Sequence, residues 1–370
     1  MLSQRHQTQR LADCCLFEFE DIIRDVDTVD MFAPVNSYDR SLEVYKWVKR
    51  LTRSTHFANW VRPEPNPYVL DREYDLFYAL LRHPLDIFSL FSIQNWRQNC
   101  QKKVCYLIEI WDNQIESHRP FIELLKDFDH IFLGVANSTE RISQITGRPC
   151  TYLPPSVDAV KFCPYPFSPD RSIDVTNIGR RSTLTHEALL ELVERGKINY
   201  LYDTVGNKVL NSQQHRILLA NQLKRSQYFI ANRPMANKPE IRGRQAEIGY
   251  RFFEGAAAGS VMLGDYPDTE MFHQYFDWED AVIRIPFDAG NIADILAELD
   301  AQPDRLEKIR RDNVINSLLR HDWVHRWKTI IETAGLSSTP QMLSREAHLQ
   351  ELAKMAYREW TSLNELSVLA

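Results

Sequence analysis

The feature that most constrains the fold of this 370-residue chain is an alternation of short apolar runs with segments of helical period. This order is typical of α/β domains built on parallel sheets. The segment 104–110 is almost continuously apolar, as expected for a parallel strand that is covered on both faces. The expected strands are 29–33, 76–80, 104–110, 131–135, 150–153, 173–178, 228–231, 261–263 and 281–285.

A proline-rich stretch divides this alternation. Five prolines lie within residues 154–169; they stiffen a connection and cannot belong to a central strand. We therefore expect an N-terminal domain over 1–165, a second domain over 166–334 and a helical extension over 335–370. Ligands bind at the carboxyl ends of parallel strands, so the site is expected there, in a cleft that the two domains face.

The two ends of the chain carry helical patterns. An amphipathic helix is expected at 10–24, where a doubly wound domain normally has a buried strand and a glycine-rich turn. The first strand is thus expected to be missing, either because the start lies too far downstream or because the domain is reduced. Helices are expected at 304–319, 323–333 and 344–363. The last of these has an apolar stripe that favours packing on the body over packing on a partner chain: Leu349, Leu352, Ala356 and Trp360.

Composition excludes several classes of protein. The net charge of −6 argues against a nucleic-acid partner. No apolar run reaches the length of about 18 residues that spans a membrane, and the polar N-terminus lacks a signal sequence. The six cysteines form no CxxC pair, which favours a cytoplasmic protein without zinc. The apolar stretch 76–93 allows peripheral membrane contact, but a buried strand and helix explain it more simply.

The segment 242–264 combines features of an anion site. Gly249 lies where a helix is expected to begin, and a helix start offers free backbone N–H groups and the positive end of the dipole. Arg251 adds positive charge, so the segment suits a diphosphate. The Glu254 carboxylate, one to two turns further on, can accept hydrogen bonds from a ribose diol. The alternative is that Glu254 and Arg251 are ordinary surface charges.

The run FEGAAAGSVML at 253–263 resembles the signature of glycosyltransferases with two Rossmann-like domains, the GT-B fold. It is most similar to group-1 glycosyltransferases of the CgeB-like branch. Three further motifs agree in order, and the resemblance covers about residues 100–334: YLPPSVD at 152–158, DVTNIGR at 174–180 and HDWVHR at 321–326. It implies an enzyme that moves a sugar, expected to be a hexose, from a nucleotide diphosphate-sugar to a hydroxyl of a glycan, lipid or protein. Such an enzyme would serve polysaccharide or glycoconjugate biosynthesis.

The resemblance also implies roles for single residues. Glu254 would hold the donor ribose, and Gly249 would face the diphosphate. Gly179 and Arg180 match a turn whose arginine contacts the donor phosphates, with Arg180 stabilising the leaving group. The adjacent Arg181 would substitute for a lysine that is often present. Because arginines and helix N-termini stabilise the departing charge in this family, neither a metal nor a cofactor is expected besides the nucleotide-sugar.

The rest of the expected donor site departs from the family pattern. Glu247, Tyr250 and Arg251 complete it, but the first glutamate of the family pair would fall on Ala246. Glu247 lies one residue away, so both the stereochemistry and the sugar stay open. Two rivals follow. One is a non-catalytic GT-B-like binding or scaffold protein with a degraded donor site, and the other is an epimerase that uses the same nucleotide cleft.

The acceptor side is less informative. Asp112, after an expected strand, would act as a base or hold an acceptor hydroxyl, unless it is only a helix N-cap. His83 also follows a strand and is suited to take a proton, although it is more simply a loop histidine. Tryptophans that would stack on a sugar are more simply core residues: Trp60, Trp96 and Trp111. Arg242 and Arg244 would add to the anion site or bind an anionic lipid acceptor, at the inner face of a membrane.

Overall fold

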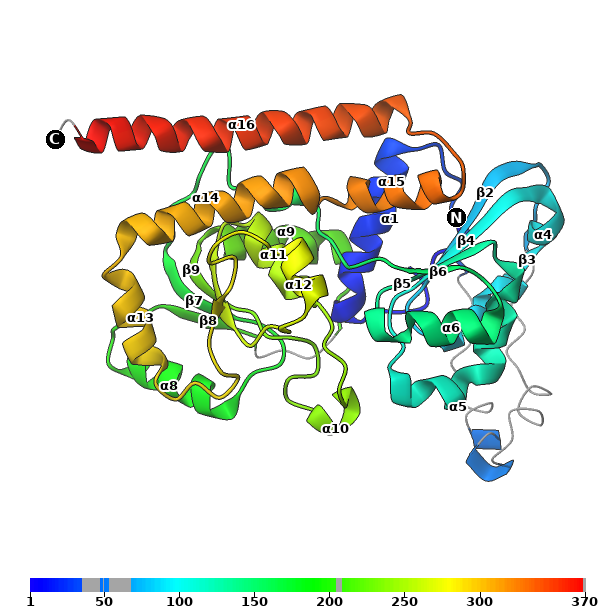
Figure 1. Ribbon diagram of the computed structural model, residues 1–370, viewed down its shortest axis with the longest axis horizontal. Coiled ribbons are helices and arrows are strands. Elements are labelled where there is room, and N and C mark those ends of the chain that lie inside the picture. The colour runs from blue at the N-terminus through cyan, green and yellow to red at the C-terminus, as the bar shows by residue number, and fades with distance from the viewer. Residues whose placement is uncertain (35–46, 49, 53–67, 204–207, 369–370) are drawn as a thin grey trace. The chain divides into compact units, whose positions relative to one another are not determined.

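The computed structural model describes residues 1–34, 47–48, 50–52, 68–203 and 208–368, with side chains described as far as residue 358 (Figure 1). The chain divides into two compact units of three segments each. Unit 1 comprises Met1–Asp13, Thr28–Pro154 and Thr329–Ser337, and unit 2 comprises Cys14–Asp27, Pro155–Lys328 and Ser338–Ala370. Each unit is built on its own parallel sheet. The expected α/β class, with two units that are each built on a parallel sheet, is confirmed.

The sheet of unit 1 has the strand order β2–β4–β5–β6, and all neighbouring strands are parallel. Its strands are β2 (Tyr74–Leu81), β4 (Cys100–Leu107), β5 (His130–Leu133) and β6 (Cys150–Tyr152). They confirm the strands expected at 76–80, 104–110, 131–135 and 150–153. A separate parallel pair joins β1 (Tyr68–Val69) to β3 (Ile93–Gln94).

Beside β2, the backbone at Leu2 extends the sheet. The N–H of Leu2 donates to the carbonyl of Tyr78 at 2.8 Å. Leu2 forms a parallel bridge with Ala79 on one side and with Phe32 on the other. The strand expected at 29–33 is therefore wrong as a strand, because only this single bridge forms there.

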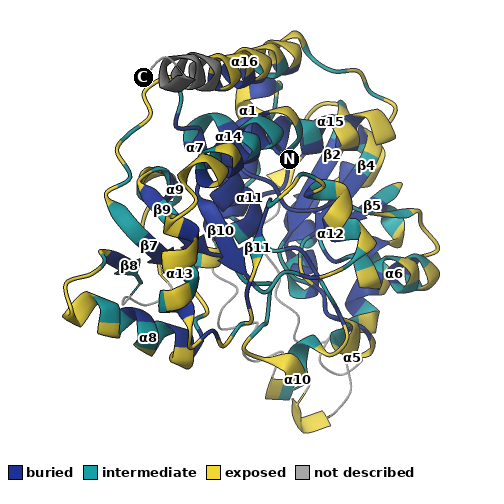
Figure 2. Ribbon diagram, turned by 60° about the vertical axis from the view of Figure 1, so that its left-hand side comes forward, coloured by how far each residue is buried: buried dark blue, intermediate teal, exposed yellow. Residues whose placement is uncertain are grey.

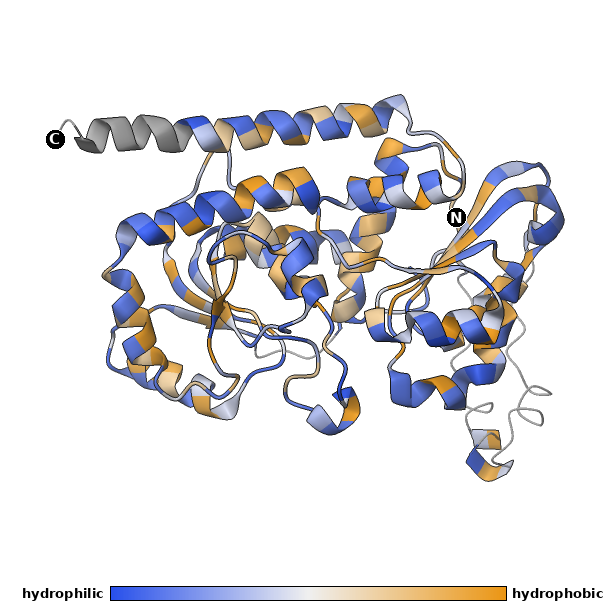
Figure 3. Ribbon diagram, in the orientation of Figure 1, coloured by the Kyte–Doolittle hydropathy of each residue, from blue (hydrophilic) through white to orange (hydrophobic). Residues whose placement is uncertain are grey.

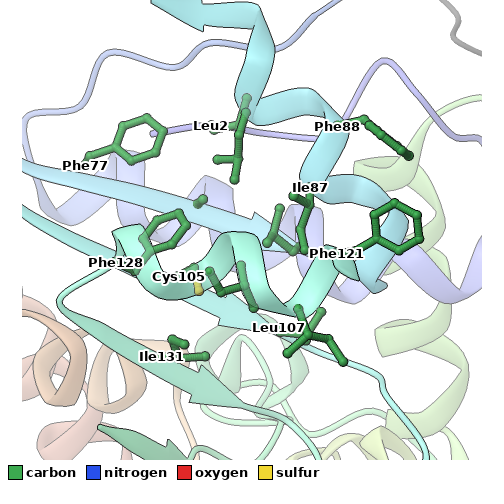
Figure 4. Packing of buried hydrophobic residues seen from close by; sticks show 14 of the residues in the cluster. Leu2, Phe77, Ile87, Phe88, Cys105, Leu107, Phe121, Phe128 and Ile131 are labelled. Carbon is green, nitrogen blue, oxygen red and sulfur yellow. The ribbon is translucent and has the colours of Figure 1, made fainter. Parts of the chain in front are cut away.

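The core of unit 1 lies between its sheet and the helices that follow each strand. These are the 3-10 helix η3 (Pro84–Ser92), α5 (Asp112–Ile122) and α6 (Thr139–Thr146). Figure 4 shows side chains such as Phe77, Phe121 and Phe128 packed in this core. Most apolar residues of the stretch 76–93 are buried in it, which confirms the interpretation as a buried strand and helix.

Within the described residues, no helix is both long enough and apolar enough to cross a lipid bilayer.

The sheet of unit 2 has the order β11–β10–β9–β7–β8, again with parallel neighbours. Its strands are β7 (Ile173–Asn177), β8 (Tyr200–Tyr202), β9 (Ser226–Ile230), β10 (Val261–Gly264) and β11 (Ile283–Arg284). Four of these were expected. The exception is β8, a strand of three residues at the edge of the sheet, which is too short to give an apolar run.

Small residues let the helix α11 (Tyr250–Ala257) lie directly on this sheet, and both α11 and β10 are buried (Figure 2). A Cβ placed on Gly255 would stand 2.7 Å from both Met262 Sδ and Phe229 Cδ1. Only a glycine therefore fits at this contact. The helix stops at the expected residue, since Gly259 has a φ of +64° and provides the left-handed turn of a Schellman motif.

The other helices of unit 2 include the three that were expected at 304–319, 323–333 and 344–363. They include α8 (Thr183–Glu194), which Ser182 caps, α9 (Ser212–Lys224), α13 (Ile292–Asp300), α14 (Pro303–Arg320), α15 (Trp323–Thr333), whose last residues belong to unit 1, and α16 (Pro340–Val368). Apolar positions recur along α16 (Figure 3), and α16 contacts α14. Leu349, Leu352 and Ala356 are buried, so the stripe packs on the body as expected. The side chain of Trp360 lies outside the described ones.

The N-terminal helix expected at 10–24 is α1 (Cys14–Val26), and it is part of unit 2. It contacts α9 and α16. Its apolar residues are buried, but so are the side chains of Glu18 and Glu20. A buried carboxylate requires partners, and those of Glu18 lead to the candidate site.

Candidate functional site

The carboxyl end of β7 continues into a turn at Gly179. Its φ of +89° is in the left-handed region that favours glycine. The N–H of Gly179 donates to Asp203 Oδ1 at 3.0 Å, directly after the neighbouring strand β8. Arg181 binds the same aspartate, with Nη1 on Oδ1 and Nη2 on the carbonyl at 2.9 Å. The turn is thus fixed to the next strand by Asp203, a residue that the sequence did not single out.

The adjacent arginines of this turn differ in their surroundings. Arg180 is exposed, and it makes no hydrogen bond or ion pair with any residue that the structure describes. Arg181 is held by Asp203, and its guanidinium carbon lies 5.3 Å from the centre of the Tyr202 ring. Arg180 is therefore open to an anionic ligand at the carboxyl edge of the sheet, while Arg181 stabilises the turn.

Helix α11 begins at the expected glycine. Gly249 is its N-cap, with φ −91° and ψ 159°, and no side chain caps the first turn. The first backbone N–H groups are therefore not satisfied by a capping side chain. A Cβ on Gly249 would stand 3.2 Å from Pro234 Cγ, so the glycine permits a close approach to the loop after β9.

Glu254 is buried, with 2% of its surface exposed. Its Oε2 accepts a hydrogen bond from Arg251 Nη1 at 2.7 Å, and its Oε1 accepts one from Arg216 Nη1. Burial acts to raise the pKa of Glu254, but the positive charges of Arg251 and Arg216 outweigh it and lower that pKa to about 2. The interpretation of Glu254 as a solvated surface charge is wrong. The carboxylate is ionised at neutral pH and bonded to two guanidinium groups.

Arg216 of α9 connects Glu254 to the N-terminal helix. Its Nε lies 3.0 Å from Glu18 Oε1, and its Nη2 lies 3.0 Å from Glu18 Oε2. The guanidinium carbon is 4.8 Å from the centre of the Phe162 ring. Arg216 is 3% exposed, and the carboxylates that face it on two sides balance its buried positive charge.

Glu18 is held by other groups as well. It accepts hydrogen bonds from the N–H of Asp158 at 3.0 Å, from Lys161 Nζ at 3.2 Å and from Trp323 Nε1 at 3.3 Å. These donors come from the proline-rich stretch 154–169 and from α15. Glu18 is thus a fully bonded carboxylate, and the position of Arg216 is fixed from three parts of the chain.

His215 is a half-buried residue that the sequence analysis missed. It lies in the first turn of α9, beside Arg216. Burial, together with the charge of Arg216, lowers the pKa of His215, and the charges of Glu254 and Arg251 also act on it. The imidazole is therefore neutral at neutral pH. Within the described residues its side chain forms no hydrogen bond, and its only sequence signal is a place in a polar stretch.

The other residues expected at the donor site lie around α11. Glu247 is buried two residues before Gly249. Tyr250 is the first residue of α11, and its ring centre lies 6.3 Å from that of Trp323. Arg242 is half-buried at the end of the short helix α10 (Pro239–Arg242), whereas Arg244 is exposed.

His83 lies at the carboxyl edge of the sheet in unit 1. It caps η3, with Nδ1 accepting from the N–H of Leu85 at 3.4 Å. Its ring is perpendicular to that of His118, with 4.8 Å between centres. Burial, and next the charge of His118, lower the pKa of His83 to about 4. The imidazole is neutral at neutral pH and only a weak base.

Asp112 is the first residue of α5, and Trp111 is the N-cap, so the interpretation of Asp112 as the cap is wrong by one residue. Arg141 Nη1 donates to Asp112 Oδ1 at 2.9 Å. Trp96 and Trp111 are buried core residues, whereas Trp60 lies outside the described residues.

The structure brings three of the predicted donor-site residues together. Arg251 Nη2 lies 3.8 Å from the position that a Cβ would take on Gly179, and Arg251 Nη1 binds Glu254. Arg180 follows Gly179 directly, and Gly249 precedes Arg251 by two residues. These residues line one edge of the sheet of unit 2, from here on called the second sheet, where β7 ends and α11 begins. His83 and Asp112 belong to unit 1 instead.

Residues 178–332 match a family model described as "Glycosyl transferase-like". The matched stretch begins at the Gly179 turn and includes α9 and α11. The resemblance to glycosyltransferases is therefore confirmed over this part of the chain. The assignment to the CgeB-like branch is finer than this match and stays a prediction.

No curated protein matches the chain. Among solved structures, a mutant of TarM from S. aureus in complex with fondaparinux, alpha-GlcNAc-glycerol and UDP has 10% identity and a TM-score of 0.46, over 70% of this chain and 55% of that one. The chain thus spans about half the length of TarM. An alpha-glucosyltransferase in complex with UDP-glucose and DNA containing an abasic site has 11% identity and a TM-score of 0.49, over 89% of this chain and 98% of that one. An alpha,alpha-trehalose-phosphate synthase (UDP-forming) from Burkholderia vietnamiensis has 12% identity and a TM-score of 0.46, over 90% of this chain and 81% of that one.

Proposed function

We propose that this chain is a glycosyltransferase that moves a sugar, a hexose, from a nucleotide diphosphate-sugar to a hydroxyl acceptor without a metal. One observation carries the proposal. In the stretch that matches the glycosyl transferase-like family, Arg180 follows the Gly179 turn, is exposed and has no hydrogen-bond or ion-pair partner among the described residues, and Arg251 lies beside that turn. This arrangement suits a ligand with a concentrated negative charge, such as a diphosphate.

The donor diphosphate would lie at the carboxyl edge of the second sheet. The uncapped first turn of α11 offers backbone N–H groups and the positive end of a helix dipole. Arg180 and Arg251 add two guanidinium groups, and Arg181 keeps the turn in place through Asp203. Glu247 and Tyr250, near the start of the same helix, complete the proposed donor site. No metal is required, because these groups supply the positive charge.

During transfer, the bond between the sugar and the diphosphate breaks, and negative charge develops on the leaving oxygen. Arg180 would stabilise that charge more strongly in the transition state than in the bound donor, which lowers the barrier. The acceptor hydroxyl must lose a proton. His83 and Asp112 are the proposed bases; His83 is neutral but a weak base because its pKa is lowered to about 4, and Asp112 is held by Arg141.

The acceptor is proposed as a glycan, lipid or protein, and the enzyme as cytoplasmic. An anionic lipid acceptor at the inner face of a membrane is one form of this proposal. Arg242 and the exposed Arg244 would then contact its headgroup. The formal charge of −6 gives no support to a nucleic-acid acceptor.

Thermal unfolding with UDP, GDP, ADP and dTDP and their sugars, in EDTA, tests the proposal. A ligand at about 100 times its dissociation constant adds roughly 2.7 kcal/mol to the folded state. We expect one nucleoside diphosphate and its sugar to raise the unfolding temperature. Release of that nucleotide from its sugar on incubation with the protein would then establish turnover. A folded protein that responds to none of the nucleotides would overturn the proposal.

One observation favours a second candidate, a nucleotide-binding or scaffold protein without catalysis. Both oxygens of Glu254 are bonded to arginines, and the side chain is buried. A donor site whose carboxylate is committed to the protein interior is consistent with lost catalysis. A protein that binds a nucleotide-sugar but never releases the nucleotide, with any acceptor offered, would support this candidate.

A further inference from the structure

Both oxygens of Glu254 already accept a hydrogen bond from an arginine. Oε2 lies 2.7 Å from Arg251 Nη1, and Oε1 is bonded to Arg216 Nη1. The side chain is 2% exposed. A ribose diol would have to reach a buried carboxylate and compete there with two guanidinium groups, and a buried arginine that loses its partner is strongly unfavourable.

The Arg216 side of this contact is fixed. Two hydrogen bonds of 3.0 Å tie Arg216 to Glu18, and Glu18 is itself held by Lys161 and Trp323. Arg216 is therefore not available to turn away and open Glu254. With Glu18 balancing the charge of Arg216, the carboxylate of Glu254 is a rigid acceptor for its other neighbour.

That other neighbour, Arg251, is the member of the group that reaches the edge of the sheet. It is 23% exposed, and only its Nη1 is used by Glu254. Its Nη2 lies 3.8 Å from where a Cβ would stand on Gly179, in the exposed turn that precedes Arg180. The bond to Glu254 thus holds one guanidinium nitrogen inside the unit while the other is presented at the turn.

We infer that Glu254 is a positioning residue, which holds Arg251 in place to bind the donor diphosphate, and that Glu18 supports it through Arg216. This inference rests on the proposed function and reassigns Glu254 from the ribose to the diphosphate part of the donor. The N-terminal helix α1 is then part of the donor-binding machinery, although it precedes the glycosyl transferase-like stretch in the chain.

Ligands that contain only part of the donor separate the two roles of Glu254. The probes are the nucleoside diphosphate that binds wild type, the corresponding nucleoside and inorganic pyrophosphate. We expect Glu254→Gln to weaken the binding of the nucleoside diphosphate and of pyrophosphate by the same factor, about ten-fold or more. The affinity for the nucleoside should not change. In an Arg251→Ala background, Glu254→Gln should have no further effect on pyrophosphate. Glu307→Gln, which alters a glutamate paired with Arg310 three residues on, is the matched control.

The outcomes distinguish this inference from the proposed function. A Glu254→Gln protein that loses affinity for the nucleoside diphosphate but not for pyrophosphate overturns the inference and supports the ribose role. Unchanged affinity for both, or a wild type that binds the nucleotide but not pyrophosphate, also overturns it. A wild type that binds no nucleotide overturns the proposed function itself. If Glu254→Gln fails to fold, Glu254→Gln combined with Arg216→Gln removes one charge of each sign, and the same comparison applies.

Discussion

Glu18 and Arg216, which are 198 residues apart in the sequence, form a buried pair with two hydrogen bonds of 3.0 Å. The pair joins the N-terminal helix α1 to helix α9. Through Arg216 it continues to Glu254 and then to Arg251. Alternating charges therefore run from α1 to the edge of the second sheet where β7 ends.

Replacing Glu18 should destabilise the protein strongly. Glu18→Gln removes the negative charge that balances Arg216 and Lys161 inside unit 2. Removing one partner of a buried ion pair costs about 3–5 kcal/mol. Denaturant unfolding measures the loss. Glu351→Gln is the matched control, because the pair of Glu351 with Lys354 is exposed, and it should change stability by less than about 0.5 kcal/mol. Equal stabilities for the two variants would contradict the structure.

Stability should fall in acid as Glu254 becomes protonated. Its pKa is about 2 in the folded protein, whereas that of an unfolded glutamate is about 4.3. Because the pKa is lower in the folded protein, the contribution of Glu254 to the free energy of unfolding is fully present above about pH 4.3 and is lost as the pH falls towards 2. Unfolding free energies measured across this range should decline less steeply for Glu254→Gln than for wild type. Parallel curves would show that the carboxylate is not ionised in the buried site.

Arg180 should matter for turnover and not for folding. Because it is exposed and makes no ion pair within the described residues, Arg180→Ala should leave the unfolding temperature unchanged. Loss of a group that stabilises the leaving diphosphate should lower kcat about 100- to 1,000-fold. Arg195→Ala, an exposed arginine after the other end of α8, is the control and should retain full activity. A wild-type kcat in Arg180→Ala would remove this residue from the mechanism.

Gly255 should not tolerate a side chain. Its Cβ would stand 2.7 Å from Met262 Sδ and Phe229 Cδ1, so Gly255→Ala forces α11 away from the sheet. We expect a loss of about 1–3 kcal/mol in denaturant unfolding. At Gly290 the added Cβ meets only the half-exposed side chain of Leu184 at 3.3 Å, so Gly290→Ala should have a much smaller effect. If both variants are equally stable, the close packing of α11 is not as described.

Local sequence signals predicted most of the fold. Gly259 marks the end of α11 because the left-handed turn there favours a glycine, and Gly249 marks its start, where a side chain would meet Pro234. The strand β8 was not predicted, because its three residues are too few to form a recognisable apolar run. The strand expected at 29–33 failed because an apolar run shows that a segment can pair, but not how many residues of it will do so.

The candidate site was predicted in part. Gly179, Arg180, Arg251 and Glu254 were singled out from motifs that lie within short stretches of sequence. Glu18, Arg216, Asp203 and His215 were not, because their importance comes from contacts made in space. The one available signal for Glu18 was its place between two phenylalanines in a helix whose first residues are apolar. Such a residue must find a partner when it is buried, but the sequence does not show which.

The most direct test of the central claim is an equilibrium titration of EDTA-treated protein with UDP, GDP, ADP and dTDP. Wild type, Arg180→Ala and the control Arg195→Ala are compared. Our account predicts that one nucleoside diphosphate binds wild type and the control equally, and binds Arg180→Ala about ten-fold more weakly or worse, since a charge-assisted contact is lost. Binding that is absent in wild type, or unchanged in Arg180→Ala, would contradict a donor site at this edge of the second sheet.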